Sequence, residues 1–422
     1  MGEQQRVVVI GQGYVGLPVA VRAAEVGFDV VGLDLDEDRV KGLKAGVSHI
    51  EDIGDDRLQA VIDLGRYRAS SDYADAAGFD VAVISVPTPL REGVPDLSYI
   101  ESSARSLAPH LREGATVILE STTYPGTTEE LVGPILEDGS GLAAGTQFHL
   151  GYSPERIDPG NTTWTLETTP KIVSGVDDAS LAAVTAFFDR LCDTTVPVPG
   201  CKEAELTKLI ENTFRHVNIA LVNELAMFAN DLGIDVWESI DAASTKPFGF
   251  MRFTPGPGVG GHCLPVDPSF LSWRVKRSLG HDFRFVELAN DINEHMPDFV
   301  VRRLMYALNR TGRALLDARI VIVGLAYKPD TGDARESPSV RVLQLLRELG
   351  ADVVAVDPHV DLDHFPATVE LVELTAELAA GADAVVLLTD HRDVDHSVLA
   401  DHAPYVLDCR RHLAAADNVE HL

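Results

Sequence analysis

The stretch VVVIGQGYVGLP, residues 7–18, decides the fold because closely spaced glycines join a buried apolar run to a helical pattern. Gly11, Gly13 and Gly16 have the G-x-G-x-x-G spacing that brings backbone amides to a pyrophosphate at a helix N-terminus. The second apolar run ends at Asp34, where a carboxylate accepts both ribose hydroxyls of NAD and rejects the 2′-phosphate of NADP. The alternative is a tight strand–helix turn without a ligand. We expect a Rossmann-type lobe that binds NAD.

The residues expected to contact NAD lie in this turn and at the carboxyl ends of the following strands, where ligands of such folds bind. Arg39 is a candidate for covering the adenosine edge, with an exposed helical arginine as the equal alternative. SVPTP and ESTTYPGTTEE close the next two strand units, although turn chemistry alone also explains their Thr and Pro content. The predicted cofactor contacts are Gly11, Gly13, Tyr14, Val15, Gly16, Asp34, Arg39, Val86, Thr88, Ser121 and Thr122.

Apolar runs alternate with amphipathic stretches through the first third of the chain, which predicts βαβ units around a buried parallel sheet. QFHLGYSP and KIVSG continue the sheet to about residue 200. The expected strands are 6–10, 29–34, 79–87 and 116–122.

A central helical segment follows. Residues 202–232 contain no Gly or Pro, and the pattern stops at Gly233, which predicts one helix of roughly 45 Å, longer than one small domain needs. One apolar stripe should pack, while a polar side at three- and four-residue spacing is available to a ligand. The stripe is Leu206, Leu209, Ile210, Phe214, Val217, Leu221 and Leu225, and the polar side is Lys208, Asn212, Arg215, His216 and Asn223. More helix is expected near 267–279 and 284–310.

The βα pattern returns near the C-terminus. A strand at 319–324, a glycine turn, a helix from about residue 337 to 349 and a strand at 352–357 predict a second doubly wound unit. The expected class is α/β, with two Rossmann-like doubly wound domains joined by a central helical segment with one long helix. The expected domains are 1–200 for NAD binding, 201–312 for the helical segment and 313–422 for the C-terminal lobe.

Composition limits the partners and the compartment. Asp and Glu total 65 against 35 Lys and Arg, and the formal charge of −30 would repel nucleic acids and anionic membranes. No apolar run reaches about eighteen residues, so we expect no membrane span. The four cysteines form no CxxC pair, and RVVVI is not preceded by a signal-peptide apolar run. We expect a reducing, cytoplasmic protein.

The loop FTPGPGVGGHCLPVDPSF is too rich in Gly and Pro for an ordinary helix or strand. Gly258, Gly260 and Gly261 remove side chains just before Cys263, which allows a ligand to approach closely and leads into a helix whose N-terminus lowers a thiol pKa. Most free cysteines are buried small hydrophobes, but this setting predicts a nucleophile. His262 has no second clustered ligand nearby in sequence, and we expect no metal.

NAD and a nucleophilic cysteine together predict oxidation of a primary alcohol beyond the aldehyde. The alcohol gives a hydride to NAD, the thiolate captures the aldehyde as a thiohemiacetal, a second hydride transfer leaves a thioester, and water releases the acid. Lys208 is suited to stabilising the oxyanions, and Asp267 with Thr122 to holding the water that moves protons. Glu155 in GYSPERIDPGN is a candidate for orienting water, with an exposed loop glutamate as the alternative.

Seven motifs follow one another along nearly the whole chain: GQGYVGLP, SVPTP, STTYPGTTE, SPE, ELTKLIENTFRHVNIALVNELA, GPGVGGHCLPVDP and GLAYKPDTGDARESPS. Together they resemble the UDP-glucose/GDP-mannose dehydrogenase family. The resemblance implies an NAD domain, a central helical dimerisation segment and a C-terminal nucleotide-sugar domain. It also implies two NAD reduced per sugar oxidised at C6 to a uronic acid.

The resemblance assigns roles to individual positions. The implied catalytic residues are Cys263 as nucleophile, Lys208 and Asn212 as the oxyanion and water-holding pair, Asp267 and Thr122 as proton handlers, and Glu155 in thioester formation or hydrolysis. The implied substrate contacts are Glu155, Arg156, Lys208, Asn212, Arg215, His216, Arg252, Gly260, Lys328, Arg335 and Arg410. Among these, Lys328, Arg335 and Arg410 match positions near the uridine diphosphate.

The identity of the sugar is a finer prediction. TKPFGFMRFTPGPGVGGHC is most similar to the UDP-N-acetylglucosamine 6-dehydrogenase branch. SPERIDPGN departs from the SPEFLxEG form of UDP-glucose enzymes, and Pro159 stands where a second glutamate is usual, which puts that glutamate's cofactor contact in doubt. We therefore expect UDP-N-acetylglucosamine, with UDP-N-acetylmannosamine and UDP-glucose as alternatives.

Two other classes of protein share some of these features. A two-domain hydroxyacid dehydrogenase similar to the 6-phosphogluconate group has a Rossmann lobe and a helical lysine, but it needs no cysteine and no second nucleotide domain. A catalytically silent NAD-sensing assembly protein would bind NAD without turning over a UDP-sugar, and Cys263, Lys208 and Asp267 together argue against it. The expected partners are a UDP-sugar and a second copy of the chain, in a homodimer or larger homo-oligomer.

Overall fold

The computed structural model describes residues 5–50, 52–157, 161, 163–261, 264–362, 365 and 367–422. The chain divides into two compact units, Met1–Glu211 and Asn212–Leu422. The division lies inside helix α7 (Cys201–Leu232), which begins and ends within one residue of the expected helix. The expected domain bounds at residues 200 and 312 stay predictions.

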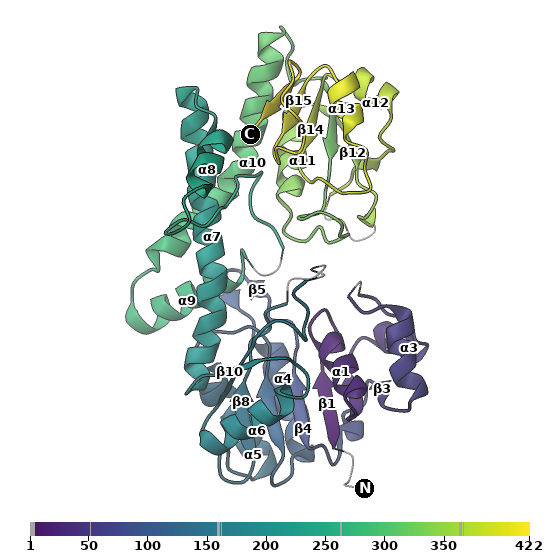
Figure 1. Cartoon of the computed structure of the whole chain (residues 1–422), viewed down its shortest axis with the longest axis vertical. Coiled ribbons are helices and arrows are strands. Elements are labelled where there is room, and N and C mark those ends of the chain that lie inside the picture. Colours follow the sequence, from purple (N-terminus) through teal and green to yellow (C-terminus); the bar gives the residue numbers. More distant parts are fainter. Residues whose placement is uncertain are drawn as a thin grey trace. The chain divides into compact units, whose positions relative to one another are not determined.

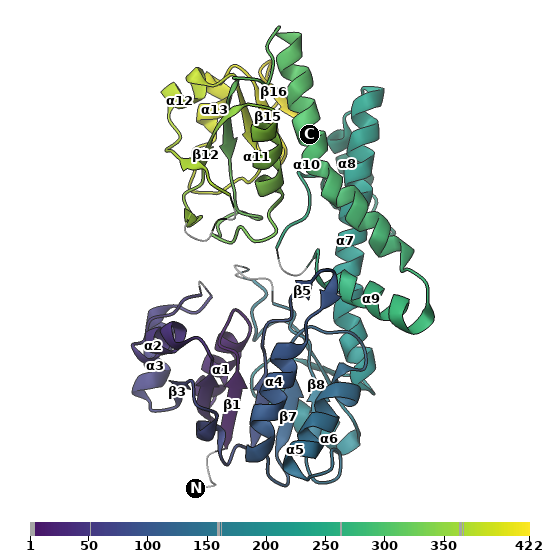
Figure 2. The same ribbon diagram turned by 180° about the vertical axis from the view of Figure 1, so that it is seen from behind.

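The N-terminal unit is built on an eight-stranded sheet with helices on both faces (Figures 1 and 2). Its strand order is β10-β9-β8-β7-β4-β1-β2-β3, and every neighbouring pair is parallel except β8 and β9. The strands are β1 (Arg6–Ile10), β2 (Asp29–Leu33), β3 (Tyr67–Ser70), β4 (Val81–Ile84), β7 (Thr116–Leu119), β8 (His149–Tyr152), β9 (Lys171–Gly175) and β10 (Thr195–Pro197), with a separate hairpin of β5 (Leu90–Arg91) and β6 (Val94–Pro95).

The helices of this unit connect the strands as the alternating pattern predicts. They are α1 (Gly16–Glu25), α2 (Glu37–Lys44), α3 (Asp55–Asp63), α4 (Ser98–Leu107), α5 (Gly133–Ser140) and α6 (Asp178–Phe188), with short turns η1 (Tyr73–Ala76), η2 (Ala108–His110) and η3 (Thr128–Val132). Val7 and Val9 of β1 pack in one core with Leu17 of α1 and Phe188 of α6. Because both faces are covered, the central strands are apolar at nearly every position.

The second unit contains a six-stranded sheet in the order β13-β12-β11-β14-β15-β16, with all pairs parallel. Its strands are β11 (Arg319–Val323), β12 (Asp352–Val356), β13 (Glu370–Leu371), β14 (Ala384–Leu387), β15 (Val406–Asp408) and β16 (Val419–His421). Its helices are α8 (Val236–Ser244), α9 (Asp267–Leu279), α10 (Arg284–Arg310), α11 (Pro338–Glu348), α12 (Ala376–Gly381) and α13 (Ser397–His402).

Alternate residues of β11 pack on opposite faces of this sheet. Ile320 and Ile322 join a core with residues of α10 and α11. Val321 and Val323 join a second core with residues of α12 and α13. The alternation follows from the two-residue period of a strand. The two helix-covered, mainly parallel sheets, and the helical segment that lies between them in the sequence, confirm the predicted fold class.

Helix α7 differs from the expected packing in one respect. Phe214, Leu221 and Leu225 of the apolar stripe are 47%, 52% and 44% exposed. On the polar side, His216 and Asn223 are buried. The reason is that α10 supplies asparagines that satisfy these two polar groups, so this part of the polar side packs within the chain, together with Leu209 of the stripe. The three exposed apolar residues are left on the outside.

No helix within the described part of the chain combines the length and apolar character needed to cross a membrane.

Candidate active site

The glycine turn after β1 has the geometry that a dinucleotide requires. Gly11 has a φ of +89°, and a Cβ there would lie 2.2 Å from the carbonyl oxygen of Ser85. A Cβ at Gly16 would lie 1.8 Å from the carbonyl oxygen of Gly11. At Gly13, however, a Cβ would meet no heavy atom within 4 Å. Gly13 therefore keeps a space open beside the N-terminus of α1, where a pyrophosphate fits.

Asp34 follows β2, and donors surround its carboxylate. Oδ2 accepts the backbone N–H of Gln12 at 2.8 Å, and Oδ1 accepts that of Asp36 at 3.0 Å. The Arg39 guanidinium donates to the two oxygens at 3.0 and 2.9 Å. The structure thus brings the predicted ribose-binding carboxylate to the glycine turn, with Arg39 directly on it.

The other predicted cofactor residues lie after β4 and β7, which are neighbouring strands. The Ser121 hydroxyl accepts the N–H of Val86 at 2.8 Å and donates to the Val86 carbonyl at 2.8 Å. This reciprocal pair holds the two strand ends together. Thr88 and Thr122 flank it and are partly exposed, as are Gly13 and Val15, while Tyr14 is 45% exposed.

Glu155 and Lys208 lie together in the N-terminal unit. The Lys208 Nζ donates to the backbone carbonyl of Glu155 at 2.6 Å. The Arg156 guanidinium donates to the Pro170 carbonyl at 2.6 Å and to Glu211 on α7 at 2.7 Å. Glu155 is 7% exposed and so is not the exposed loop glutamate of the alternative reading.

Asn212 and Asp267 form a buried pair in the second unit. The Asn212 Nδ2 donates to Asp267 Oδ2 at 2.5 Å, and the two residues are 6% and 4% exposed. Asp267 is the first residue of α9, where a carboxylate is stabilised by the helix N-terminus. The pair joins α7 to the start of the helix that follows the cysteine loop.

The glycines of the cysteine loop lie close to other parts of the second unit. A Cβ at Gly260 would lie 2.7 Å from the carbonyl oxygen of Glu336, and one at Gly261 would lie 2.7 Å from the Tyr327 ring. The Gly261 N–H donates to the Arg335 carbonyl at 3.2 Å. These glycines allow the loop to pack on residues 327–338. Close approach of a ligand to Gly260 stays a prediction.

The predicted nucleophile Cys263 and its neighbour His262 lie outside the described residues, as does Pro159. The cysteines within the described part of the chain are Cys192, Cys201 and Cys409, all buried and free. Burial raises the pKa of the Cys192 and Cys201 thiols to about 12 and raises that of Cys409 as well. These three are small core hydrophobes and not nucleophiles.

The predicted nucleotide contacts of the second unit follow strand ends of the six-stranded sheet. Lys328 and Arg335 lie in the loop after β11, and Arg335 pairs with Asp333 at 2.6 Å. Arg410 follows β15, and its Nε donates to the Leu388 carbonyl at 2.6 Å. A Cβ at Gly256 would lie 3.0 Å from the Arg410 guanidinium, so Arg410 also lies against the first part of the cysteine loop.

Three further predicted substrate contacts lie on or near α7 and α8. Arg215 is exposed on α7. His216 is buried, with Nε2 at 2.7 Å from Asn290 Oδ1, and burial lowers its pKa. Arg252 pairs with Asp241 at 2.9 Å and is 47% exposed.

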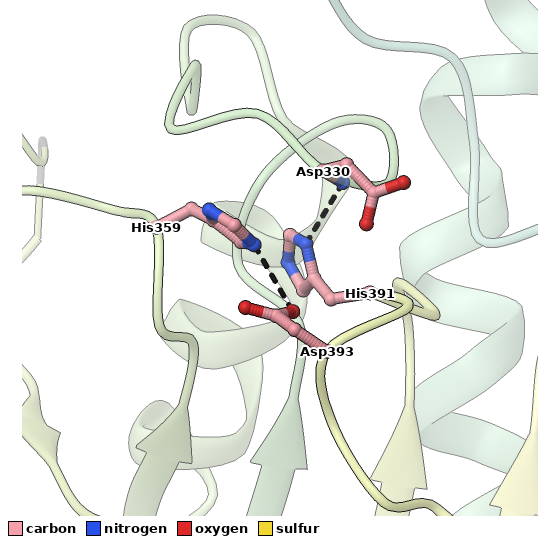
Figure 3. A group of neighbouring side chains, drawn as sticks. All are labelled: Asp330, His359, His391 and Asp393. Atoms are coloured by element: carbon pink, nitrogen blue, oxygen red, sulfur yellow. Dashed lines mark hydrogen bonds and ion pairs between the residues drawn. The ribbon is translucent and has the colours of Figure 1, made fainter.

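A group of His and Asp side chains gathers at the carboxyl edge of the six-stranded sheet (Figure 3). Asp330, His359, His391 and Asp393 offer ligand atoms within 4.8 Å of one another. His391 Nδ1 accepts the Asp330 N–H at 3.0 Å, and Nε2 donates to Asp357 at 3.0 Å. Because both ring nitrogens of this buried histidine are bonded within the protein, the group acts as a hydrogen-bond network that joins three loops.

Glu120 and Lys171 were not singled out in the sequence, although they lie beside Glu155. Lys171 Nζ donates to Glu155 Oε2 at 2.9 Å and to Glu120 Oε1 at 2.5 Å. Two charged residues directly bordering the apolar runs TVIL and IVSG were the available signal. The pairing itself depends on β9 running antiparallel to β8, which the local sequence does not indicate.

Three family models match the chain in order. They are described as the NAD binding domain, the central domain and the UDP binding domain of the UDP-glucose/GDP-mannose dehydrogenase family, and they match residues 5–191, 202–295 and 321–415.

Individual relatives cover most of the chain. A UDP-N-acetyl-D-mannosamine dehydrogenase of Pyrococcus horikoshii is 38% identical over 92% of this chain and 89% of its own. An NDP-N-acetyl-D-galactosaminuronic acid dehydrogenase of Ralstonia nicotianae is 35% identical over 91% of this chain and 90% of its own. A solved structure of a UDP-D-ManNAc dehydrogenase from Pyrococcus horikoshii superposes with a TM-score of 0.90 at 35% identity, and covers 99% of both chains.

The glycine turn, Asp34 and the strand-end residues fit NAD, and the matches extend over both sheets and the helices between them. The chain belongs to the UDP-glucose/GDP-mannose dehydrogenase family and is an NAD-dependent nucleotide-sugar dehydrogenase.

Proposed function

We propose that this chain oxidises the C6 hydroxymethyl group of a UDP-N-acetylhexosamine to the carboxylate. Each sugar consumes two NAD⁺ and one water, and yields two NADH, the uronate and three protons. The observation that carries the proposal is the ordered match of NAD, central and UDP binding domains, with Cys263 inside the central match.

NAD, when bound, accepts the hydride of each oxidation step. Gly13 leaves room for its pyrophosphate, and Asp34 accepts its ribose hydroxyls once Arg39 shifts. Lys328, Arg335 and Arg410 are the proposed contacts of the uridine diphosphate.

The roles of the reacting residues follow from their chemistry. The Cys263 thiolate adds to the aldehyde carbon, and the resulting thiohemiacetal becomes a thioester when its hydride leaves. Lys208 donates to the oxyanion, and Asn212 with Asp267 holds water. Attack of water on the thioester breaks the C–S bond and returns the thiol. Thr122 completes the proton path, and Glu155 serves the thioester steps.

UDP-N-acetyl-D-mannosamine is the substrate that we place first. The Pyrococcus relative and the solved structure carry that name. The cysteine loop favours UDP-N-acetylglucosamine instead, and the two sugars differ only in configuration at C2. UDP-glucose ranks below these two sugars because the Pyrococcus relative and the solved structure are both named for an N-acetylated sugar.

A panel of UDP-sugars compared by kcat/KM, with mass-spectrometric identification of the product, tests this proposal. We expect UDP-N-acetylmannosamine or UDP-N-acetylglucosamine to exceed UDP-glucose by at least about a hundredfold, because a pocket that hydrogen-bonds an acetamido group rejects the analogue that lacks it. A preference for UDP-glucose, or a product at the aldehyde level, would contradict the proposal.

The exposed stripe of α7 supports a homodimer as the working assembly. Within the second unit, a groove of about 740 Å³ runs along this stripe and is lined mainly by apolar side chains. Its walls include Phe214, Leu221, Leu225 and Phe228 of α7 and Phe250 of the loop after α8. A second copy of the chain would remove this apolar surface from water.

The three family matches also support division of the chain near residues 200 and 312. A cytoplasmic location stays a prediction from the cysteine pattern and the acidic composition.

A further inference from the structure

Lys171 lies between two buried carboxylates, and we call Glu120, Glu155 and Lys171 the buried triad. The side chains of Glu120, Lys171 and Glu155 are 0%, 3% and 9% exposed. Glu120 follows β7 and Glu155 follows β8, while Lys171 is the first residue of β9. Since β9 runs antiparallel to β8, its first residue lies at the edge where β7 and β8 end.

The triad holds the Glu155 carboxylate by both oxygens. Oε1 accepts the backbone N–H groups of Arg156 and Ile157, each at 2.6 Å, and Oε2 accepts from Lys171 at 2.9 Å. Burial works to raise the pKa of Glu155, but Lys171, the Ile157 N–H and the charge of Lys208 outweigh it, and the net shift is downward. Glu155 is therefore an ionised acceptor in a fixed orientation.

Glu120 is bound less completely. Its Oε1 accepts from Lys171, but its Oε2 is buried and has no hydrogen-bond partner among the described residues. Burial raises the pKa of Glu120 to about 7. The charge of Lys171 opposes this rise, and the charge of Glu155 adds to it. One ammonium group neutralises one of the two carboxylates, so a proton on Glu120 brings the net charge of the triad to zero.

Other charged groups near the triad do not supply the missing neutralisation. Lys208 lowers the pKa of Glu155 from the α7 side, but its Nζ donates to the Glu155 backbone carbonyl. The charges of all three triad members and of Glu167 influence the pKa of Cys192, which follows α6. Burial raises this pKa and keeps the thiol neutral. The Lys171 Nζ lies 5.1 Å from the centroid of the Phe188 ring, so this side of the ammonium faces an aromatic side chain and not a charged group.

We propose that Lys171 and Glu120 are positioning residues for Glu155. Lys171 keeps the Glu155 carboxylate ionised and in place, and a proton bound by Glu120 lets Lys171 act as the counter-ion of Glu155 alone. The proposal rests on the role of Glu155 in the proposed function. Loss of Lys171 would leave two carboxyl groups in one buried site, and Glu155 would then hold a proton at a pH where it is now ionised.

Infrared titration of the ligand-free protein tests the charge state without substrate. Protein labelled with ¹³C-glutamate should show protonated carboxyl absorbance that disappears around pH 7, and Glu120→Gln should remove part of it. Glu205→Gln is the matched control, because burial also raises the pKa of Glu205 to about 7, yet its partners are Gly126 and Thr128. A spectrum unchanged by Glu120→Gln would overturn the proposal.

The pH profile of kcat tests the link to the reaction. We expect Lys171→Met to move the acidic limb upward by at least about one pH unit, because Glu155 loses its cation. Lys171→Arg should restore the wild-type profile, whereas a purely structural role predicts lower kcat at every pH with an unchanged profile.

These experiments separate failure of the proposal from failure of the proposed function. If the wild-type protein oxidises no UDP-sugar, the proposed function fails, and the infrared titration still decides how the triad is protonated. If Lys171→Met does not fold, Glu120→Gln keeps the shape of the side chain, and its infrared spectrum decides the question.

Discussion

At the scale of single residues, burial separates the reactive groups from the inert ones. Three described cysteines are buried, and burial raises the pKa of each thiol. Cys263 follows a glycine-rich loop that packs on residues 327–338, where the predicted nucleotide contacts Lys328 and Arg335 lie. Of the four cysteines, we therefore expect Cys263 to be the nucleophile and the other three to be core residues.

The variant Cys263→Ser should lose turnover by at least about a thousandfold, because a hydroxyl at neutral pH is a poor nucleophile. NADH binding, measured by fluorescence titration, should be unchanged because the NAD domain match ends at residue 191. Cys409→Ser is the control and should keep its activity if it folds. Full activity of Cys263→Ser would exclude the thioester route.

Asp357 should make the second unit sensitive to acid. Its carboxylate accepts N–H groups from Leu325, Ala326, His359 and Val360 as well as the His391 Nε2. Burial works to raise the pKa of Asp357, but these donors lower it to about 2. Since the folded pKa lies below the unfolded one, this stabilisation is present above about pH 4 and is lost as the pH falls through 2.

The variant Asp357→Asn should therefore lower the free energy of unfolding by about 2 kcal/mol at pH 7, because charge-assisted hydrogen bonds are lost. Urea unfolding at several pH values checks this, and the difference between wild type and variant should shrink between pH 4 and pH 2. A constant difference over that range would be inconsistent with this role of Asp357.

At the scale of elements, the strand–turn–helix unit at residues 6–25 was predictable because its determinants are local. The apolar strand, the glycine spacing and the acidic residue after β2 all lie within one βαβ unit. Asp34 was expected at the ribose site, but its bonds with Arg39 depend on side-chain geometry that the pattern does not specify.

Two alanine variants separate the roles of the turn glycines. Gly13→Ala should fold normally, because its Cβ meets nothing within 4 Å, yet it should weaken NAD binding at least about tenfold by occupying the pyrophosphate space. Gly16→Ala should destabilise the fold, since its Cβ would lie 1.8 Å from a carbonyl oxygen. Calorimetry and NADH titration measure both effects. Unchanged NAD affinity in Gly13→Ala would argue against a pyrophosphate site at this turn.

Helix α7 shows where a periodic pattern stops being informative. The sequence predicts an apolar stripe and a polar side, but the buried face of the helix combines Leu209 of the stripe with His216 and Asn223 of the polar side. Asn290 and Asn293 of α10 decide this by bonding His216 and Asn223, more than sixty residues away in sequence. Such long-range satisfaction of polar groups has no local signature.

Self-association through the exposed stripe can be tested with two leucines. Leu225 lines the groove and Leu349 follows α11, and both are 44% exposed. Leu225→Glu should shift the protein from dimer to monomer in sedimentation velocity, because a charge in an apolar interface is costly. Leu349→Glu should not change the assembly. Equal behaviour of the two variants would place the interface elsewhere.

At the scale of the whole molecule, the fold class and the cofactor could be predicted from the sequence, because both doubly wound lobes show the same strongly local pattern. The buried triad was not, since it joins three strands through an antiparallel pairing. The sugar also remained open, because its recognition depends on a few polar contacts that the pattern does not specify. The UDP binding match favours a nucleotide sugar over a simple hydroxy acid.

A four-electron oxidation on one enzyme is distinguished from a two-electron oxidation by counting the NADH formed per sugar. Purified protein is given limiting UDP-N-acetylmannosamine with excess NAD, and the NADH formed is divided by the sugar consumed. We expect a ratio of two with the uronate as product. A ratio of one, with an aldehyde or ketone as product, would contradict a four-electron oxidation.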